Sequence, residues 1–404
     1  MFTSKYFKDN RLSLTKRLSG SELIVITAQG LMQRSGDVTF PFRQDSNFLY
    51  LTGLMNVPDV VLVIDGNNEF LILPKRSETD TIFGGTIDCD NIAKISGIAT
   101  ILSNNDGWRK VEKLQNNRKT IHVVGSAPPQ IVGIDSFYTN PARRRLIHKL
   151  KRLFPNTKFN DLRTDIMQMR QVKQSVEIEA IKQAITITKS GFAAATKRVR
   201  LSAYEYQIEA EFDHVFKQKN ATHGYGPPII AAGANTCKLH YHGGLNRFSA
   251  GEFILMDVGA EYKGYSADVT RMRKVDAVSD RHMAVYNAVV AVHRYAIGLL
   301  RPGLDWREYI LKTEEFMGEE LVKLGLIQRP ERRHIRKYFS HAIGHSLGLD
   351  VHDVCDYKTI LENMVITVEP GIYIPEEGIG VRIEDDILIT KDCANNLSNE
   401  IPLL

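Results

Sequence analysis

Residues 253–275 read FILMDVGAEYKGYSADVTRMRKV, and this stretch decides the fold of the second half of the chain. The apolar run FILM leads into Asp257, the turn signal EYKGY follows, and Asp268 opens a second strand-like run. The pattern predicts two adjacent hairpin strands that each carry one carboxylate. Because a charge on an apolar strand is costly to bury, one such aspartate alone would indicate an ion pair or a strand end.

Two glutamates occupy similar positions further along the chain. Glu369 ends the apolar run MVITV before a Pro-Gly pair, and Glu384 lies in VRIEDD. Strand alternation places Arg382 and Glu384 on one face. Four carboxylates on strand-like segments, each near Gly or Pro, favour a carboxylate-rich metal site over four separate ion pairs.

Histidines complement these acids. Five of them lie in two short segments of the same half: His240 and His242 in ANTCKLHYH, and His341, His345 and His352 in HAIGHSLGLDVHD. Two Asp, two Glu and one His form an oxygen-dominated ligand set, which favours Mn over a thiolate-bound metal, with Co or Zn as alternatives. Two divalent ions would offset four negative charges, whereas one ion would leave a buried excess. The pattern therefore predicts a pair of metal ions.

The motif GHSLG at residues 344–348 matches the GxSxG nucleophile elbow of serine hydrolases. That fold needs an acid and then a histidine well downstream of the serine, but after Ser346 the chain offers only Asp350 and His352. This spacing is too short for a triad, so we expect Ser346 to be structural. The chain also lacks an HExxH helix, a GxxxxGK[ST] loop and a GxGxxG fingerprint, which argues against those three site classes.

Residues 1–163 mix short β-rich runs with helical ones. The runs SELIVITAQ, DVVLVID, EFLILP and KTIHVVG predict strands, and RLIHKLKRLF predicts a helix that Pro155 ends. This alternation predicts an α/β domain. Residues 164–404 open with a helix that Ser175 can cap, with Glu177 and Glu179 in its first turn. A second helix follows Ser279, and blocks of strands make this part α+β.

The chain has 404 residues and a formal net charge of +5, with 43% hydrophobic residues. Residues 1–163 carry a balance of +8 and the remainder −3. The basic residues of PARRRLIHKLKRLFP alternate with apolar residues at helical spacing, which predicts an amphipathic helix with a solvated basic face rather than a nucleic-acid site. No apolar run approaches the length of a membrane span, and the charged start shows no secretory signal. The four cysteines are widely spaced, so we expect no disulfide and a cytoplasmic location.

The quoted motifs resemble those of the M24 "pita-bread" metallopeptidases. LMDVGAEYKGYSADVTR is similar to their two-aspartate motif, SHAIGHSLGLDVHD to their histidine motif, and VITVEPGIYI and GIGVRIEDDILIT to their two glutamate motifs. FPFRQDSNFLYLTGL resembles a stretch typical of aminopeptidase P. The resemblance covers nearly the whole chain. It implies an α+β fold with a creatinase-like α/β domain over residues 1–163 and a pita-bread catalytic domain over residues 164–404.

The resemblance also implies roles for particular residues. Five would bind two divalent ions, Mn before Co or Zn: Asp257, Asp268, His345, Glu369 and Glu384. Asp268 and Glu384 would bridge the ions. Glu369 would transfer the proton from the attacking water to the leaving nitrogen. The substrate would contact His240, His341, His352, Tyr373 and Arg382, of which His240 and His352 would also act in catalysis.

The implied reaction removes an N-terminal residue that precedes proline, by attack of a metal-bridged hydroxide. We expect a homodimer or homotetramer, and a first domain that narrows the way into the site. Departures from the family pattern affect the rim and not the ligands: a short gap from His352 to Glu369, a short linker at Pro375–Gly378, Cys355, Ile82, and His242 in HYHGG.

Several alternatives stay open. A prolidase, which cleaves only Xaa-Pro dipeptides, shares all five ligands, although the FRQDSNFLY stretch favours aminopeptidase P. A metal-free pita-bread binding protein would have lost ligands that this chain keeps. Creatine-type amidinohydrolases generally lack the full metal set, and a methionine aminopeptidase would not normally carry this first domain.

Overall fold

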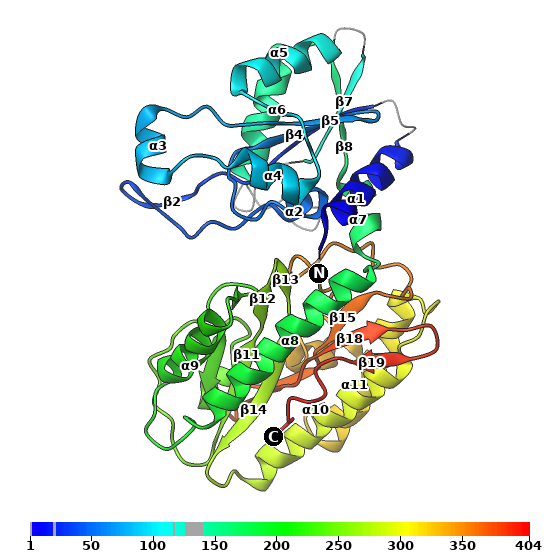
Figure 1. Cartoon of the computed structure of the whole chain (residues 1–404). Helices are drawn as coiled ribbons and strands as arrows, with labels where there is room; N and C mark the ends of the chain where they lie inside the picture. Colours follow the sequence, from blue (N-terminus) through cyan, green and yellow to red (C-terminus); the bar gives the residue numbers. More distant parts are fainter. Residues whose placement is uncertain (1, 19–21, 116–117, 126–139) are drawn as a thin grey trace. The chain divides into compact units, whose positions relative to one another are not determined.

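The computed structural model describes residues 2–18, 22–115, 118–125 and 140–404, and the chain divides into two compact units, Met1–Met169 and Arg170–Leu404 (Figure 1). Both units mix helices and strands, as the sequence predicts. All four cysteines are free, in agreement with their spacing. Within the described ranges, no helix is both long and apolar enough to cross a membrane.

The first unit is built around a six-stranded sheet of order β6-β5-β4-β1-β7-β8. Its strands are β1 (Leu23–Thr27), β4 (Val61–Asp65), β5 (Asn68–Ile72), β6 (Ile101–Leu102), β7 (Thr120–Val123) and β8 (Lys158–Asp161), and a separate hairpin joins β2 (Gln33–Ser35) and β3 (Val38–Thr39). The helices are α1 (Ser4–Arg17), α2 (Ser46–Thr52), α3 (Glu78–Gly84), α4 (Cys89–Ser96), α5 (Asn104–Gln115), α6 (Pro141–Leu153) and α7 (Arg163–Arg170). The four strands predicted from the sequence are β1, β4, β5 and β7.

Helix α6 confirms the amphipathic interpretation of the basic stretch. The Asn140 side chain caps its start, and Pro141 occupies the first turn, where its missing N–H costs nothing. Leu146 and Leu150 pack into the core beside β1 and β4, while the side chains of Arg144, Arg145, Lys151 and Arg152 are exposed. The charge of this helix therefore belongs to a solvated face.

The second unit is organised by a three-stranded antiparallel sheet of β10 (Ile229–Ala232), β11 (Glu252–Val258) and β14 (Val269–Val275). Ile254 and Met256 pack with residues of α8 (Ser175–Thr196) and α9 (Glu205–Gln218). Phe253 and Leu255 pack with residues of α10 (Asp280–Leu299) and α11 (Trp306–Lys323). Both faces of β11 are thus covered by helices, which explains why its sequence is a continuous apolar run.

Smaller strands complete the second unit. One sheet contains β15 (Val365–Val368), β18 (Asp385–Ile389) and β19 (Ala394–Asn396), and a hairpin joins β16 (Gly371–Ile374) to β17 (Ile379–Arg382). A third group contains β9 (Thr222–His223), β12 (Ala260–Tyr262) and β13 (Tyr265–Ser266). A short 3-10 turn, η2 (Gly233–Cys237), and helix α12 (Arg332–Tyr338) connect these elements.

The start of α8 differs from the sequence prediction. Gln174, not Ser175, is the N-cap, and its backbone N–H donates to Oε2 of Glu177 at 2.8 Å. The other Glu177 oxygen accepts from the Tyr265 hydroxyl at 2.9 Å, so this buried carboxylate holds the cap in place. Glu179 lies beyond the first turn and pairs with Lys182 instead.

Candidate metal centre

The four acidic residues of the sequence motifs converge from different elements. Asp257 lies within β11, whereas Asp268 precedes β14, Glu369 follows β15 and Glu384 lies between β17 and β18. The strand positions predicted for the last three are therefore wrong by one or two residues. Their backbones pair outside the regular ladders, since Glu369 N–H donates to the Ile343 carbonyl at 2.8 Å. These breaks in the ladders turn the carboxylates towards one another.

The segment that carries His345 runs alongside β15. His345 N–H donates to Oγ1 of Thr367 at 3.0 Å, and Thr367 N–H donates to the His345 carbonyl at 2.8 Å. A side chain at Gly344 would collide with the Thr367 carbonyl, so only glycine permits this approach. The local sequence therefore fixes His345 beside Glu369.

One cavity of about 370 Å³ collects the predicted site residues. It is lined by all five predicted ligands, Asp257, Asp268, His345, Glu369 and Glu384, and by His240, His242, His341, His352 and Arg382. Tyr373 stands behind this lining and reaches it through its hydroxyl, which lies 2.9 Å from Nε2 of His341. Every predicted site residue is thus part of the cavity wall or in contact with it.

Nε2 of the His345 ring faces the carboxylates. Its Nδ1 lies 3.1 Å from the Ser346 carbonyl, which can only accept, so Nδ1 carries the proton of the neutral ring. The lone pair on Nε2 then points towards oxygens of Asp268 at 3.5 Å and Glu369 at 3.6 Å. Lone pairs of three such groups repel one another unless a cation lies between them.

Burial and mutual repulsion both favour raised pKa values in this group of carboxylates. Burial and the charges of neighbouring acids raise the pKa of Asp268 and of Glu384 well above their ordinary values, and burial raises the pKa of Glu369. Within the described chain, no donor reaches the buried Oδ1 atom of Asp268. Asp268, His345 and Glu384 offer ligand atoms that all lie within 4.8 Å of one another. These observations fit residues that hold divalent cations.

Arg382 lines the same cavity and contacts one of the predicted ligands directly. Its Nη2 donates to Oδ2 of Asp257 at 2.5 Å, and its Nη1 donates to the Tyr373 hydroxyl at 3.0 Å. His341 donates from Nδ1 to the Ala342 carbonyl, so its Nε2 accepts from Tyr373. Burial and the Arg382 charge lower the pKa of His341 to about 3, which keeps this imidazole neutral.

Two functional neighbours were missed by the sequence reasoning. The Tyr225 hydroxyl donates to Oδ1 of Asp257 at 2.5 Å, and Oγ1 of Thr270 donates to Oε2 of Glu384 at 2.7 Å. Thr270 could have been predicted from the sequence as a neighbour of the site, because strand alternation places it on the same face as Asp268. Tyr225 lies in the Gly- and Pro-rich segment THGYGPP, whose irregular backbone offers no such periodicity.

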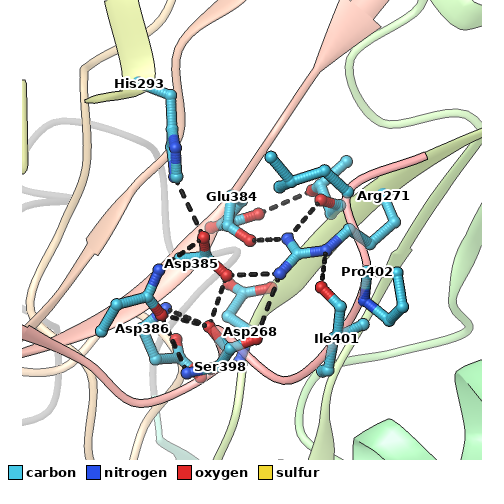
Figure 2. Close-up of polar contacts among 12 residues, drawn as sticks. Asp268, Arg271, His293, Glu384, Asp385, Asp386, Ser398, Ile401 and Pro402 are labelled. Carbon is cyan, nitrogen blue, oxygen red and sulfur yellow. Dashed lines mark hydrogen bonds and ion pairs between the residues drawn. The ribbon is translucent and has the colours of Figure 1, made fainter. Parts of the chain in front are cut away.

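A buried arginine ties the metal-site strands to the end of the chain. Arg271 donates to the carbonyls of Glu384 at 2.6 Å and Ile401 at 3.0 Å, and to Oδ1 of Asp385 at 2.5 Å (Figure 2). Ser398 adds a carbonyl acceptor and donates its hydroxyl to Asp385. This network joins β14 to β18 directly behind Asp268 and Glu384.

Asp386 belongs to the same network and supports Asp268 from behind. Its Oδ2 accepts from the backbone N–H of Asp268 at 3.2 Å (Figure 2). Nε2 of His293 lies 3.2 Å from Oδ2 of Asp385 on the other side. The ligand-bearing backbone is therefore held by buried polar groups and not by strand pairing alone.

Ser346 is fully buried, and its hydroxyl oxygen accepts from Nζ of Lys173 at 3.1 Å. Lys173 also pairs with Oδ2 of Asp353 at 3.3 Å, so the lysine keeps a partner when the hydroxyl is removed. We expect Ser346→Ala to keep kcat/KM within about tenfold, or roughly 1.4 kcal/mol. Steady-state kinetics with the metal content measured in parallel would test this, and a loss of several orders of magnitude at unchanged metal content would favour a serine nucleophile.

Comparisons with known proteins agree with this geometry. Residues 179–391 match the model of metallopeptidase family M24, and residues 7–124 match the N-terminal domain of aminopeptidase P. The Xaa-Pro aminopeptidase of Escherichia coli K12 is 31% identical, with 98% of this chain and 94% of that protein covered.

Solved structures match over the same length. Aminopeptidase P from E. coli with the inhibitor Pro-Leu has a TM-score of 0.87 at 29% identity and covers 100% of this chain and 97% of that one. Proline aminopeptidase P II from Yersinia pestis has a TM-score of 0.87 at 30% identity, with 99% and 97% covered. The predicted family, the two-domain fold and the metal-dependent hydrolase class are confirmed, and the chain belongs to metallopeptidase family M24.

Proposed function

We propose that this protein is an Xaa-Pro aminopeptidase that uses two divalent ions, Mn before Co or Zn, to release an N-terminal residue preceding proline. The proposed ligands are Asp257, Asp268, His345, Glu369 and Glu384, with Asp268 and Glu384 shared between the ions. The observation that carries the proposal is the position of Nε2 of His345, which faces oxygens of Asp268 and Glu369 at 3.5 and 3.6 Å.

The relatives support both the activity and the substrate. The E. coli relative is named an Xaa-Pro aminopeptidase, and an E. coli aminopeptidase P structure holds the inhibitor Pro-Leu. The acceptable substrate would be a peptide with proline at its second position. The cytoplasmic location and the homodimer or homotetramer remain proposals that rest on the sequence.

The chemistry divides between the ions and the side chains. When bound, divalent ions lower the pKa of water to near neutrality and polarise a carbonyl group. Glu369 lines the cavity with its carboxylate, which can accept a proton and pass it to the leaving nitrogen. His240 and His352 line the same cavity, where imidazole N–H groups can donate to a developing oxyanion.

Substrate length separates this activity from that of a prolidase. Between β16 and β17 the chain makes a tight turn, in which Gly378 N–H donates to the Pro375 carbonyl at 3.2 Å. Its four residues are not among those that line the cavity, so the place predicted for this linker on the rim is not supported. We expect higher kcat/KM for Xaa-Pro-Yaa tripeptides than for Xaa-Pro dipeptides, because a backbone contact beyond proline adds transition-state binding.

Initial rates on the matched set Ala-Pro-Ala, Ala-Pro and Ala-Ala-Ala, with Mn present, test the proposal. The expected order places the tripeptide with proline first and the peptide without proline last. Faster hydrolysis of Ala-Pro than of Ala-Pro-Ala would assign the protein as a prolidase, and equal rates on all three peptides would remove the proline requirement.

A further inference from the structure

Glu205, the first residue of α9, is a fully buried carboxylate outside the metal centre. Among the described residues no Lys, Arg or His forms an ion pair with it. Its charge is instead met by the N–H groups of Ala232 at 2.9 Å and Asn246 at 3.1 Å and by the Tyr241 hydroxyl at 2.9 Å. A buried anion needs such donors, and these three all come from the segment 232–246.

The segment 232–246 supplies part of the catalytic cavity. Leu239, His240 and His242 line that cavity, and Tyr241 lies between the two histidines in sequence. The backbone of the segment is also fastened to α9, since Glu205 N–H donates to the Asn246 carbonyl at 3.1 Å. Glu205 therefore contacts the beginning, the middle and the end of this segment.

The contact in the middle of the segment is the hydrogen bond from the Tyr241 hydroxyl to Glu205, and it depends on a neighbouring glycine. A side chain at Gly243 would collide with the Tyr241 hydroxyl and ring, so the tyrosine folds back over the glycine to reach Glu205. Burial and the Glu205 carboxylate raise the pKa of Tyr241 to about 12, so its hydroxyl remains a donor at neutral pH. The HYHGG sequence thus encodes both the tyrosine and the space that it needs.

The side chain of His240 has few contacts of its own that would hold it in position. Its side chain is exposed, and within the described chain it makes no hydrogen bond. Its direction into the cavity depends on the backbone of the segment, which Glu205 holds through Tyr241 and the two N–H groups. We propose that Glu205 is a positioning residue that sets His240 against the substrate, an inference that rests on the proposed function only in the kinetic part of its test.

The first measurement does not depend on enzymatic activity. Hydrogen exchange of the intact protein is followed by mass spectrometry for wild type, Glu205→Gln, Tyr241→Phe and the control Tyr206→Phe. Tyr206 is an exposed neighbour whose hydroxyl makes no hydrogen bond in the described chain. We expect peptides from residues 233–246 to exchange about tenfold faster in Glu205→Gln and less so in Tyr241→Phe, with the control unchanged. Unchanged exchange in both test variants would overturn the proposal, whatever the substrate.

The second measurement is a double-mutant cycle on Ala-Pro-Ala. We expect Glu205→Gln to lower kcat/KM by about tenfold or more in the wild-type background, but by less than about twofold once His240→Ala is present. Metal content should stay the same in all four proteins. Equal losses in both backgrounds would mean that Glu205 does not act through His240. Wild-type protein that fails to cleave Ala-Pro-Ala would instead count against the proposed function, and the exchange result would still decide the role of Glu205.

Discussion

Asp268→Ala should lower kcat/KM by roughly a thousandfold or more, about 4 kcal/mol of transition-state stabilisation. Asp268 is the proposed bridging ligand, and its Oδ2 lies 3.5 Å from Nε2 of His345. Removing it takes one negative charge from a cluster that is proposed to hold two cations, and it would take a ligand from both of them. Steady-state kinetics on Ala-Pro-Ala, with metal measured by elemental analysis, should show lower activity together with less than two ions per chain.

His242→Ala provides the matched control. His242 lines the same cavity, but it is exposed and is not one of the proposed ligands. We expect its removal to cost less than about tenfold in kcat/KM and to leave the metal content unchanged. Similar turnover of the two variants would contradict the ligand assignment.

The central hairpin could be predicted from the sequence because its signals are local. The apolar run before Asp257 and the turn EYKGY define two strands of one antiparallel pair, and the structure pairs Asp257 with Thr270. Neighbouring strands in one hairpin need no knowledge of distant residues. The same holds for α6, whose basic and apolar residues alternate with helical spacing.

The contacts that support the proposed ligands could not be predicted, because they join residues that are far apart in the sequence. Thr270 and Glu384 are 114 residues apart, and Arg271 reaches Ile401 across 130 residues. Sequence periodicity assigns a residue to a face but does not show which distant segment meets that face. The exact ends of the strands around Asp268 and Glu384 are set by these contacts, which explains why the predicted strand positions were displaced.

Glu205 illustrates the same difficulty. In the sequence it is an acidic residue in the first turn of a helix, a position that the helix dipole favours for ordinary surface glutamates. Its burial and its contact with Tyr241, 36 residues away, arise only when the segment folds back over α9. A local pattern cannot distinguish such a residue from a solvated one.

Removal of metal should abolish hydrolysis, and it should also weaken the fold in a pH-dependent way. In the ion-free protein the pKa values of Asp268, Glu369 and Glu384 are raised above their ordinary 3.8 and 4.5. The folded state then binds more protons than the unfolded state above about pH 4, so the free energy of unfolding falls as pH rises. Bound cations offset this charge and add stability of about 2.7 kcal/mol at a hundredfold excess over Kd. The stability difference between metal-loaded and chelated protein should therefore widen as pH rises from about 4.5 to 7.

Thermal unfolding of both forms across this pH range, together with kinetics on Ala-Pro-Ala, provides the measurement. Readdition of Mn or Co to the chelated protein should restore activity, and elemental analysis should find about two ions per chain. Chelator already saturated with Mn serves as the control, since it tests for effects of the chelator itself. Full activity in protein shown to be free of metal would exclude the two-metal mechanism. A stability difference that stays constant with pH would mean that the cations do not bind at these three carboxylates, because the repulsion among them is what the ions are expected to relieve.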